Sequence, residues 1–252
     1  KQKVTFQDLI MHWRKELNRI NADQLEGVDL TDGEFKQVMA KVSQISNSYE
    51  AAKLLAIEES KGKIDGIYRD PNPSITRQQI TLTIFKKAQV SGGDSSYKIA
   101  REVVSSNDNR FDIVLLINGL PLINIEQKRT DKSLNEAFGQ FQRYYRDGEY
   151  SNNFMAFSQM MVITTEIETR YFATPKSADD FNQSFVFHWS DRENKAINNW
   201  QKVIEHFLMI PMAHQMVGDY LVIDEDPDNE ENRRHMLMRP YQVYALQAIE
   251  GA

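Results

Sequence analysis

The feature that most constrains the fold of this chain is a predicted hairpin over residues 111–127. Its first strand, FDIVLLI, carries apolar residues on both faces, which predicts a strand covered on both sides; the exception is Asp112. Asn118-Gly119 follows, and this dipeptide is a strong signal for a two-residue turn. The return strand ends with Glu126 and, just beyond it, Lys128. Three charged side chains therefore come to one end of a strand pair that needs a larger sheet around it.

The register of this hairpin decides whether the two carboxylates can act together. With a regular two-residue turn, Asp112 would lie opposite Ile125 and would point to the other side of the sheet from Glu126. One extra residue in the turn, or one β-bulge, brings both carboxylates to the same face. Pro121 is a natural place for it, because proline cannot donate a ladder hydrogen bond. We therefore predict one of these irregularities between Asn118 and Ile123.

Two carboxylates beside an ammonium group form the donor set of a magnesium site. Mg²⁺ prefers oxygen ligands at about 2.1 Å and usually takes one or two carboxylates. Asp112 and Glu126 are the candidate ligands, and the backbone carbonyl of Gln127 can add a third protein oxygen. Lys128 lies two residues after Glu126, hence on the same face, where it can orient a water or neutralise charge on a phosphate. The pattern predicts a metal-dependent phosphodiesterase with Asp112, Glu126 and Lys128 as its catalytic residues.

A helix predicted over residues 133–145, opened by a capping box, follows the hairpin. Gln140 and Tyr144 are four residues apart and therefore share one helical face. They can contact the DNA backbone or hold water molecules next to the metal. Arg143 adds positive charge where a phosphate would approach.

Each of these residues also has an ordinary structural interpretation. A lone acidic residue such as Asp112 is more often satisfied locally at a strand end, and Glu126 with Lys128 is more often a solvated ion pair. Gln140 and Tyr144, taken alone, are more often surface residues. Only the spacing of these residues on a common hairpin favours a site.

The rest of the chain predicts a mixed α/β fold with a central sheet flanked by helices. Apolar residues at three- and four-residue spacings predict helices over 5–20, 31–45, 51–57 and 194–210. Apolar and β-branched runs predict strands over 79–85, 111–117, 120–125, 160–165, 169–173 and 184–189, while 97–104 fits a strand or a short helix.

We expect four segments along the chain. Residues 1–105 should be mostly helical, and residues 106–223 should hold the core of the domain and the helices after it. Residues 224–235 form an acidic run that predicts a linker. Residues 236–252 should begin another domain. The chain starts with Lys and stops within an expected helix, so we expect a piece of a longer protein.

The composition excludes several other classes of protein. With 30 Lys and Arg against 36 Asp and Glu, the net charge of −6 opposes a free-standing, non-specific nucleic-acid binder. The absence of cysteine excludes disulfides and thiolate chemistry, and the spacing of the five histidines does not suggest a zinc site. No stretch suggests a membrane span or a secretory signal, so we expect a cytoplasmic protein. No Walker loop is present, so this piece should not bind ATP by itself.

The stretch FDIVLLINGLPLINIEQKR, followed by Gln140-x3-Tyr144, closely resembles the nuclease domain of the R (motor) subunit of type I restriction enzymes. The resemblance continues through ITTEIETRYFA and FVFHW to MRPYQ, which is similar to the entry of a superfamily 2 helicase motor. It implies a PD-(D/E)xK restriction-endonuclease-like fold. By position, the resemblance implies that Asp112 and Glu126 are metal ligands and that Lys128 is the catalytic lysine. It also implies that Gln140 and Tyr144 form the family's additional motif beside the site. Gln242 would match the residue of the motor that contacts adenine.

The resemblance also implies a biological role. It implies Mg²⁺-dependent, non-specific cleavage of double-stranded DNA after ATP-driven translocation by an attached motor. The expected partners are the modification (methyltransferase) and specificity subunits, and ATP would bind only to the full-length protein. We expect the isolated piece to be nearly inactive.

Members of that family tend to carry a further acidic residue on an early helix, and Glu16, Glu50 and Glu58 are the candidates for it. Two alternative functions remain open. One is a non-catalytic docking module that couples the motor to its partner subunits. The other is a repair or junction nuclease of the same fold.

Overall fold

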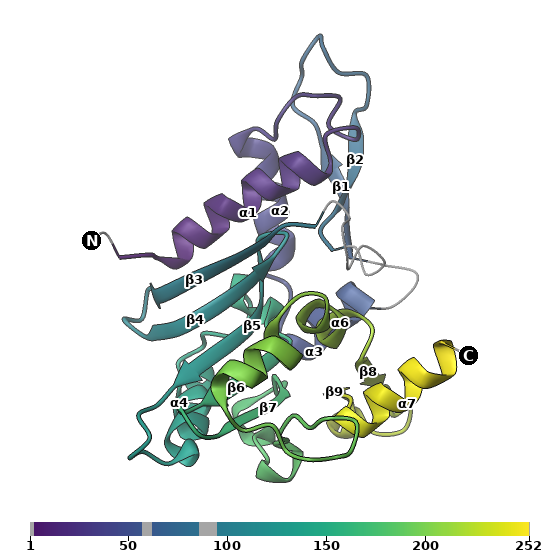
Figure 1. Ribbon diagram of the computed structural model, residues 1–252. Coiled ribbons are helices and arrows are strands. Elements are labelled where there is room, and N and C mark those ends of the chain that lie inside the picture. Colours follow the sequence, from purple (N-terminus) through teal and green to yellow (C-terminus); the bar gives the residue numbers. More distant parts are fainter. Residues whose placement is uncertain (1–2, 57–61, 86–94, 252) are drawn as a thin grey trace.

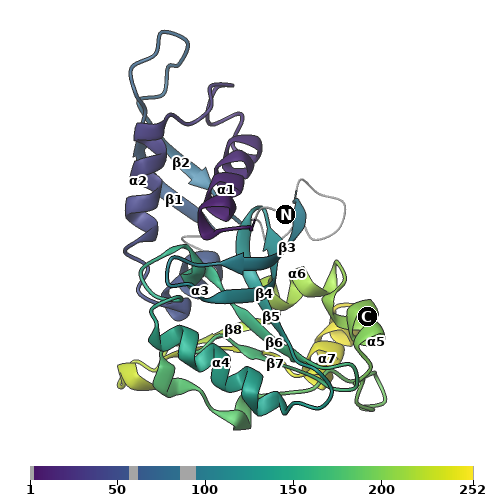
Figure 2. The same cartoon turned by 90° about the vertical axis from the view of Figure 1, so that its left-hand side faces the viewer.

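The computed structural model describes residues 3–56, 62–85 and 95–251. A five-stranded sheet with the strand order β3-β4-β5-β6-β7 lies at its centre, with helices around it (Figures 1 and 2). The predicted mixed α/β architecture, a central sheet flanked by helices, is confirmed. The strands are β3 (Tyr97–Val104), β4 (Arg110–Ile117), β5 (Leu120–Gln127), β6 (Met160–Thr164) and β7 (Thr169–Ala173).

A helical crossover joins the middle of this sheet. β5 and β6 pair in parallel, whereas the other neighbouring strands pair antiparallel. A parallel pair needs a long connection, and α4 (Leu134–Arg146) and the 3₁₀ helix η1 (Phe154–Phe157) provide it. Phe138 and Phe141 of α4 pack on Phe172 of β7, with ring centroids 5.3 and 6.1 Å away. This packing fixes α4 against the sheet at β6 and β7.

The predicted N-terminal helices are present as α1 (Phe6–Ile20), α2 (Asp32–Val42) and α3 (Ser48–Ala56). α1 and α2 begin with capping boxes, in which Thr5 pairs with Asp8 and Thr31 with Glu34. Trp13 of α1 is fully buried against the rings of η1. Figure 2 shows α1 and α2 above the strands of the sheet and α4 below them.

The expectation that residues 1–105 are mostly helical is wrong beyond α3. β1 (Lys63–Tyr68) and β2 (Gln79–Thr83) form an antiparallel hairpin that projects at the top of Figure 1, and residues 97–104 form β3. The predicted strands do not include β1. Gly66 in fact lies inside β1 with a φ of 66°, where the register shifts as in a β-bulge.

Two predictions after β7 are also wrong. Residues 184–189 do not form a strand: they contain the end of η3 (Gln183–Phe185) and a single bridge from Phe187 to Tyr171. The helix predicted over 194–210 begins only at Trp200, as α5 (Trp200–Val203), and continues as the π-helix η4 (Ile204–Leu208). The side chain of Asn199 accepts hydrogen bonds from the first helical N–H groups, and this cap sets the later start.

The acidic run predicted as a linker lies within a strand pair. β8 (Leu221–Asp224), which follows α6 (Met212–Gly218), pairs antiparallel with β9 (Arg234–Leu237) across it. The short 3₁₀ helices η2 (Ala178–Asp180) and η5 (Glu230–Asn232) complete this region. The last helix, α7 (Pro240–Glu250), packs on the same body, since Val243 is buried and the Tyr244 hydroxyl donates to the Ser190 carbonyl at 2.9 Å. The start of a further domain at residue 236 stays a prediction.

Among the helices of the described segments, none has the length and apolar character that a membrane crossing requires.

Candidate active site

The hairpin between β4 and β5 contains the predicted irregularity. Asn118 and Gly119 form its turn with φ values of 50° and 80°, the left-handed backbone that a tight two-residue hairpin turn needs. The register then shifts between Leu115 and Leu116, so that Leu122 is an extra residue in β5. The predicted irregularity between Asn118 and Ile123 is confirmed as a bulge, but its extra residue is Leu122, whereas Pro121, the expected place, pairs with Leu116.

The bulge brings the two carboxylates together. Beyond it, Ile113 pairs with Ile125, so Asp112 and Glu126 become the next opposed residues and point to the same face. The backbone N–H of Gln127 donates to Oδ2 of Asp112 at 2.9 Å. Both predicted metal ligands therefore lie at one end of the hairpin, with the Gln127 peptide beside them.

Glu126 is the most deeply buried of these charged groups, with 1% of the residue exposed. Burial raises the pKa of Glu126 to about 7; the hydrogen bond from Lys128, at 2.6 Å, lowers the pKa, and the charge on Asp112 raises it. Lys128 therefore offsets only part of the cost of burying the Glu126 carboxylate. A further cation beside the two carboxylates would offset more of it, and two adjacent carboxylates fit a hard divalent cation such as Mg²⁺.

A chain of hydrogen bonds connects Lys128 to the start of β4 through α4. The Lys128 ammonium donates to Oε1 of Gln140, Nε2 of Gln140 donates to the Tyr144 hydroxyl, and that hydroxyl donates to the carbonyl of Arg110, each at 2.7 Å. The structure therefore brings Gln140 and Tyr144 to the carboxylates, as their spacing suggested. Sequence reasoning missed Arg110, and no sequence signal marks it, because the group involved is a backbone carbonyl.

Tyr144 and Arg143 of α4 differ in how far their side chains are exposed to solvent. Tyr144 is only 3% exposed and donates into the protein, which favours a role in holding Lys128 over a contact with DNA. Burial, and secondly the charge on Glu126, raise the pKa of Tyr144, so its hydroxyl remains a proton donor. Arg143 is exposed, with its guanidinium carbon 5.3 Å from the centroid of the Tyr144 ring. Metal binding by the Gln127 carbonyl stays a prediction.

The additional early acidic ligand is not found among the described residues. Glu16 lies beside Gly119 at the turn end of the hairpin, away from Asp112, and accepts a hydrogen bond from Ser96 at 2.7 Å. Glu50 lies on α3, which packs on β8 and β9, and Glu58 lies outside the described residues. Within residues 3–56, 62–85 and 95–251, no three His, Asp or Glu side chains are placed to share a metal ion. Of the candidate acidic residues that the structure describes, Asp112 and Glu126 lie together at the end of the hairpin.

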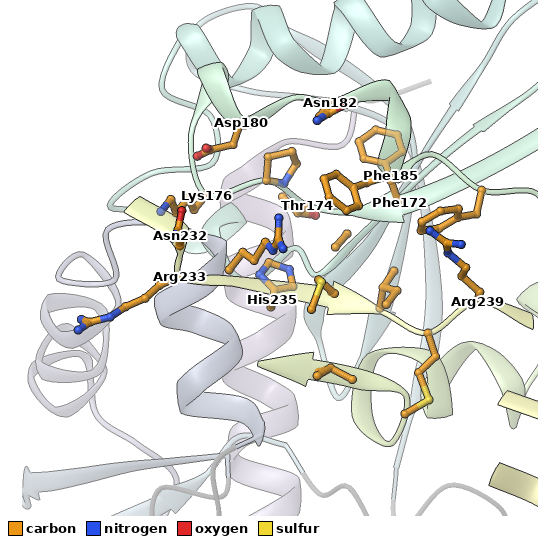
Figure 3. A pocket seen from close by; sticks show the side chains of 18 of the residues that line it. Phe172, Thr174, Lys176, Asp180, Asn182, Phe185, Asn232, Arg233, His235 and Arg239 are labelled. Atoms are coloured by element: carbon orange, nitrogen blue, oxygen red, sulfur yellow. The ribbon is translucent and has the colours of Figure 1, made fainter. Parts of the chain in front are cut away.

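A sizeable cavity of the described structure lies elsewhere. It has a volume of about 730 Å³ and is bounded by β7, β9 and the start of α7, with Phe185, His235 and Arg239 among its lining residues (Figure 3). Neither carboxylate of the β4–β5 hairpin lines it. Gln242 lines this cavity, and its Oε1 accepts the backbone N–H of Arg239 at 2.8 Å, which caps α7. The predicted contact of Gln242 with adenine stays a prediction.

Comparison with known proteins gives a consistent result. The model of the family described as "Type I restriction enzyme R protein N terminus" matches residues 2–180. The endonuclease subunit of the type I restriction enzyme SauCOLORF180P of Staphylococcus aureus (strain COL) is 34% identical over 98% of this chain and 25% of its own length. The endonuclease subunit of the type I restriction enzyme EcoprrI of Escherichia coli is 28% identical over 75% of this chain and 54% of its own length. The chain thus spans about a quarter of the length of the first of these relatives.

Proposed function

The chain belongs to the family of type I restriction enzyme R protein N termini, and we propose that it is the Mg²⁺-dependent nuclease domain of such an enzyme, with the PD-(D/E)xK fold. Its relatives carry the name endonuclease subunit, which supports a role in restriction and an assembly of several subunits. The proposal goes further and assigns the hydrolysis of phosphodiester bonds to the end of the β4–β5 hairpin.

One observation carries this assignment: the bulge at Leu122 places Asp112 and Glu126 on the same face. Without the bulge, the two carboxylates would point to opposite sides of the sheet and could not share a metal ion. A bulge disturbs the ladder locally, and such irregularities are over-represented next to active sites. The adjacency of Asp112 and Glu126 thus has a direct use in a metal site.

In the proposed site, Asp112 and Glu126 would hold Mg²⁺, with the Gln127 carbonyl as a candidate third oxygen. When bound, the ion would polarise a phosphate oxygen and lower the pKa of a bound water. Lys128 places its ammonium group next to Glu126, where it can stabilise the negative charge that develops on the phosphate. Gln140 fixes that ammonium group by accepting its second hydrogen bond.

The substrate proposed for the whole protein is double-stranded DNA, cut without sequence specificity after translocation by an attached ATP-driven motor. Arg143 is exposed on α4 next to Tyr144 and can contact a backbone phosphate. The proposed partners are the modification (methyltransferase) and specificity subunits. ATP would bind in the motor, where the proposal assigns an adenine contact to Gln242.

The variant Lys128→Ala in the assembled full-length enzyme tests this function. We expect it to abolish DNA cleavage while translocation and ATP hydrolysis remain. Lys132→Ala is the matched control, because Lys132 lies four residues further on and faces solvent beside Glu136 at 3.7 Å. Unchanged cleavage by Lys128→Ala would eliminate the nuclease assignment and favour the alternative of a docking module.

A further inference from the structure

We propose that Glu149 is a positioning residue for the active site, which it serves by fastening the β3–β4 loop, residues 105–109, to the C-terminal end of α4. The inference rests on the proposed function, because it assigns Glu149 the task of holding Asp112 in place. Glu149 is a buried acidic residue outside the hairpin, with 2% of the residue exposed.

Glu149 holds the loop at both of its ends. Its Oε1 accepts hydrogen bonds from the Ser105 hydroxyl at 2.5 Å and from Nδ2 of Asn109 at 2.8 Å. The Ser105 hydroxyl oxygen in turn accepts the backbone N–H groups of Asn107 and Asn109, both at 3.2 Å. The Ser105 hydroxyl and the Asn109 amide that donate to Glu149 are uncharged groups. Their hydrogen bonds therefore offset the cost of burying this carboxylate without an ion pair between them and Glu149.

Asp147 strengthens the same attachment. Its carbonyl accepts from Nδ2 of Asn107 at 2.9 Å, and its Oδ2 accepts from Nδ2 of Asn109 at 3.0 Å. The backbone N–H of Glu149 donates to the carbonyl of Tyr144 at 3.0 Å. The segment that holds the loop is thereby joined to the helical turn that carries Tyr144.

The attachment continues directly into the active site. Arg110 follows Asn109, and its carbonyl accepts the Tyr144 hydroxyl at 2.7 Å. Asp112 comes two residues later on β4, about 7 Å of extended chain beyond Arg110. One end of α4 therefore fixes the entry of β4 twice, through Glu149 at the loop and through Tyr144 at Arg110. Loss of the Glu149 contacts should leave Asp112 less well placed.

The backbone N–H of Gln127 reports the position of Asp112 without any metal. It donates to Oδ2 of Asp112 at 2.9 Å, so displacement of Asp112 removes its acceptor and exposes it to exchange with solvent. The amide of Val162, buried in the middle of β6, reports instead on the opening of the whole sheet. The ratio of the two exchange rates separates positioning from general stability.

The experiment compares amide hydrogen exchange in the full-length wild-type protein with that in its Glu149→Ala and Asn153→Ala variants. Fragmentation of the exchanged protein isolates the Gln127 amide. Asn153 is the matched control: its Nδ2 donates to the Gly148 carbonyl at 2.9 Å, but none of its described hydrogen bonds reaches the loop. We expect Glu149→Ala to accelerate exchange at Gln127 by about tenfold or more relative to Val162. The control should leave that ratio unchanged.

Glu149→Gln keeps an acceptor oxygen for Ser105 and Asn109 and is expected to restore the wild-type ratio, which guards against a folding defect of the alanine variant. Equal acceleration at Gln127 and Val162, or unchanged exchange at Gln127, would overturn the proposal. Mn²⁺ affinity, measured by calorimetry on the same variants, should fall about tenfold in Glu149→Ala alone. Failure of the wild-type protein to bind Mn²⁺ would refute the proposed function, whereas the exchange ratio would still test the positioning by Glu149.

Discussion

Replacement of Gln140 by methionine isolates the contribution of the α4 residues to the proposed chemistry. Methionine has a similar length but can neither accept the bond from Lys128 nor donate to Tyr144, both of which are 2.7 Å long. A hydrogen bond that involves a charged group is worth about 1.5–3 kcal/mol. If this bond fixes the ammonium group in the transition state, its loss lowers the cleavage rate by roughly 10–150-fold.

We expect the lower part of that range, because Lys128 keeps its bond to Glu126 at 2.6 Å. Single-turnover cleavage of linear duplex DNA by the assembled enzyme measures the rate, with ATP hydrolysis as the internal reference. Gln142→Met is the matched control, since Gln142 lies on the same helix and, within the described residues, its side chain donates to the Ala178 carbonyl at 2.9 Å and not to the site. Equal cleavage rates for the two variants would refute the role assigned to Gln140.

Two further predictions concern stability. Glu34 and Arg69 form an ion pair at 2.9 Å, and both side chains are 1% exposed. Arg69→Met leaves the Glu34 carboxylate buried without this partner and should lower the free energy of unfolding by about 3–5 kcal/mol in urea titrations. A loss below about 1 kcal/mol would contradict this. Burial lowers the pKa of His235 from its ordinary 6.5 to about 4, so the unfolded chain takes up a proton before the folded protein as the pH falls. Stability should therefore decrease by up to about 3 kcal/mol between about pH 6.5 and pH 4 on account of His235, and His235→Leu should remove that part of the pH dependence; an unchanged pH profile would contradict it.

The elements predicted best from the sequence are those whose signals are local. Ser133 marks the start of α4, where its side chain accepts the N–H of Asn135 at 3.1 Å, but the capping box predicted with Glu136 is wrong: within the described residues, Glu136 lies beside Lys132 instead. Capping boxes form at Thr5 and Thr31, which start α1 and α2. The bulge in β5 could be predicted as well, because the turn dipeptide fixes the register and two carboxylates on opposite faces would have no shared use.

The errors occurred where distant contacts decide the structure. Residues 184–189 have the composition of a strand, yet among the described residues Phe187 alone of this segment forms a β-bridge, to Tyr171, so no ladder forms. The helix predicted from residue 194 starts late because Ala196 instead bridges to Ser190 and Asn199 provides the cap.

The candidate site shows the same division. Asp112, Glu126 and Lys128 could be chosen from spacing along one hairpin, whereas the burial of Tyr144 and its bond to a backbone carbonyl depend on how α4 packs. Glu16 and Glu50 were candidates only because they are acidic and lie on early helices; their positions relative to the hairpin are set by tertiary packing. The contact of Glu149 with the β3–β4 loop joins residues about forty positions apart, for which the sequence has no local signal.

The most direct test of the account is the location of a divalent cation. Crystals of the protein soaked in Mn²⁺ and measured at the manganese absorption edge should show an anomalous density peak between the carboxylates of Asp112 and Glu126, and Glu126→Gln should remove it. A peak at another group of residues, or no peak at a Mn²⁺ concentration that supports cleavage by the assembled enzyme, would contradict the assignment of the metal site to this hairpin.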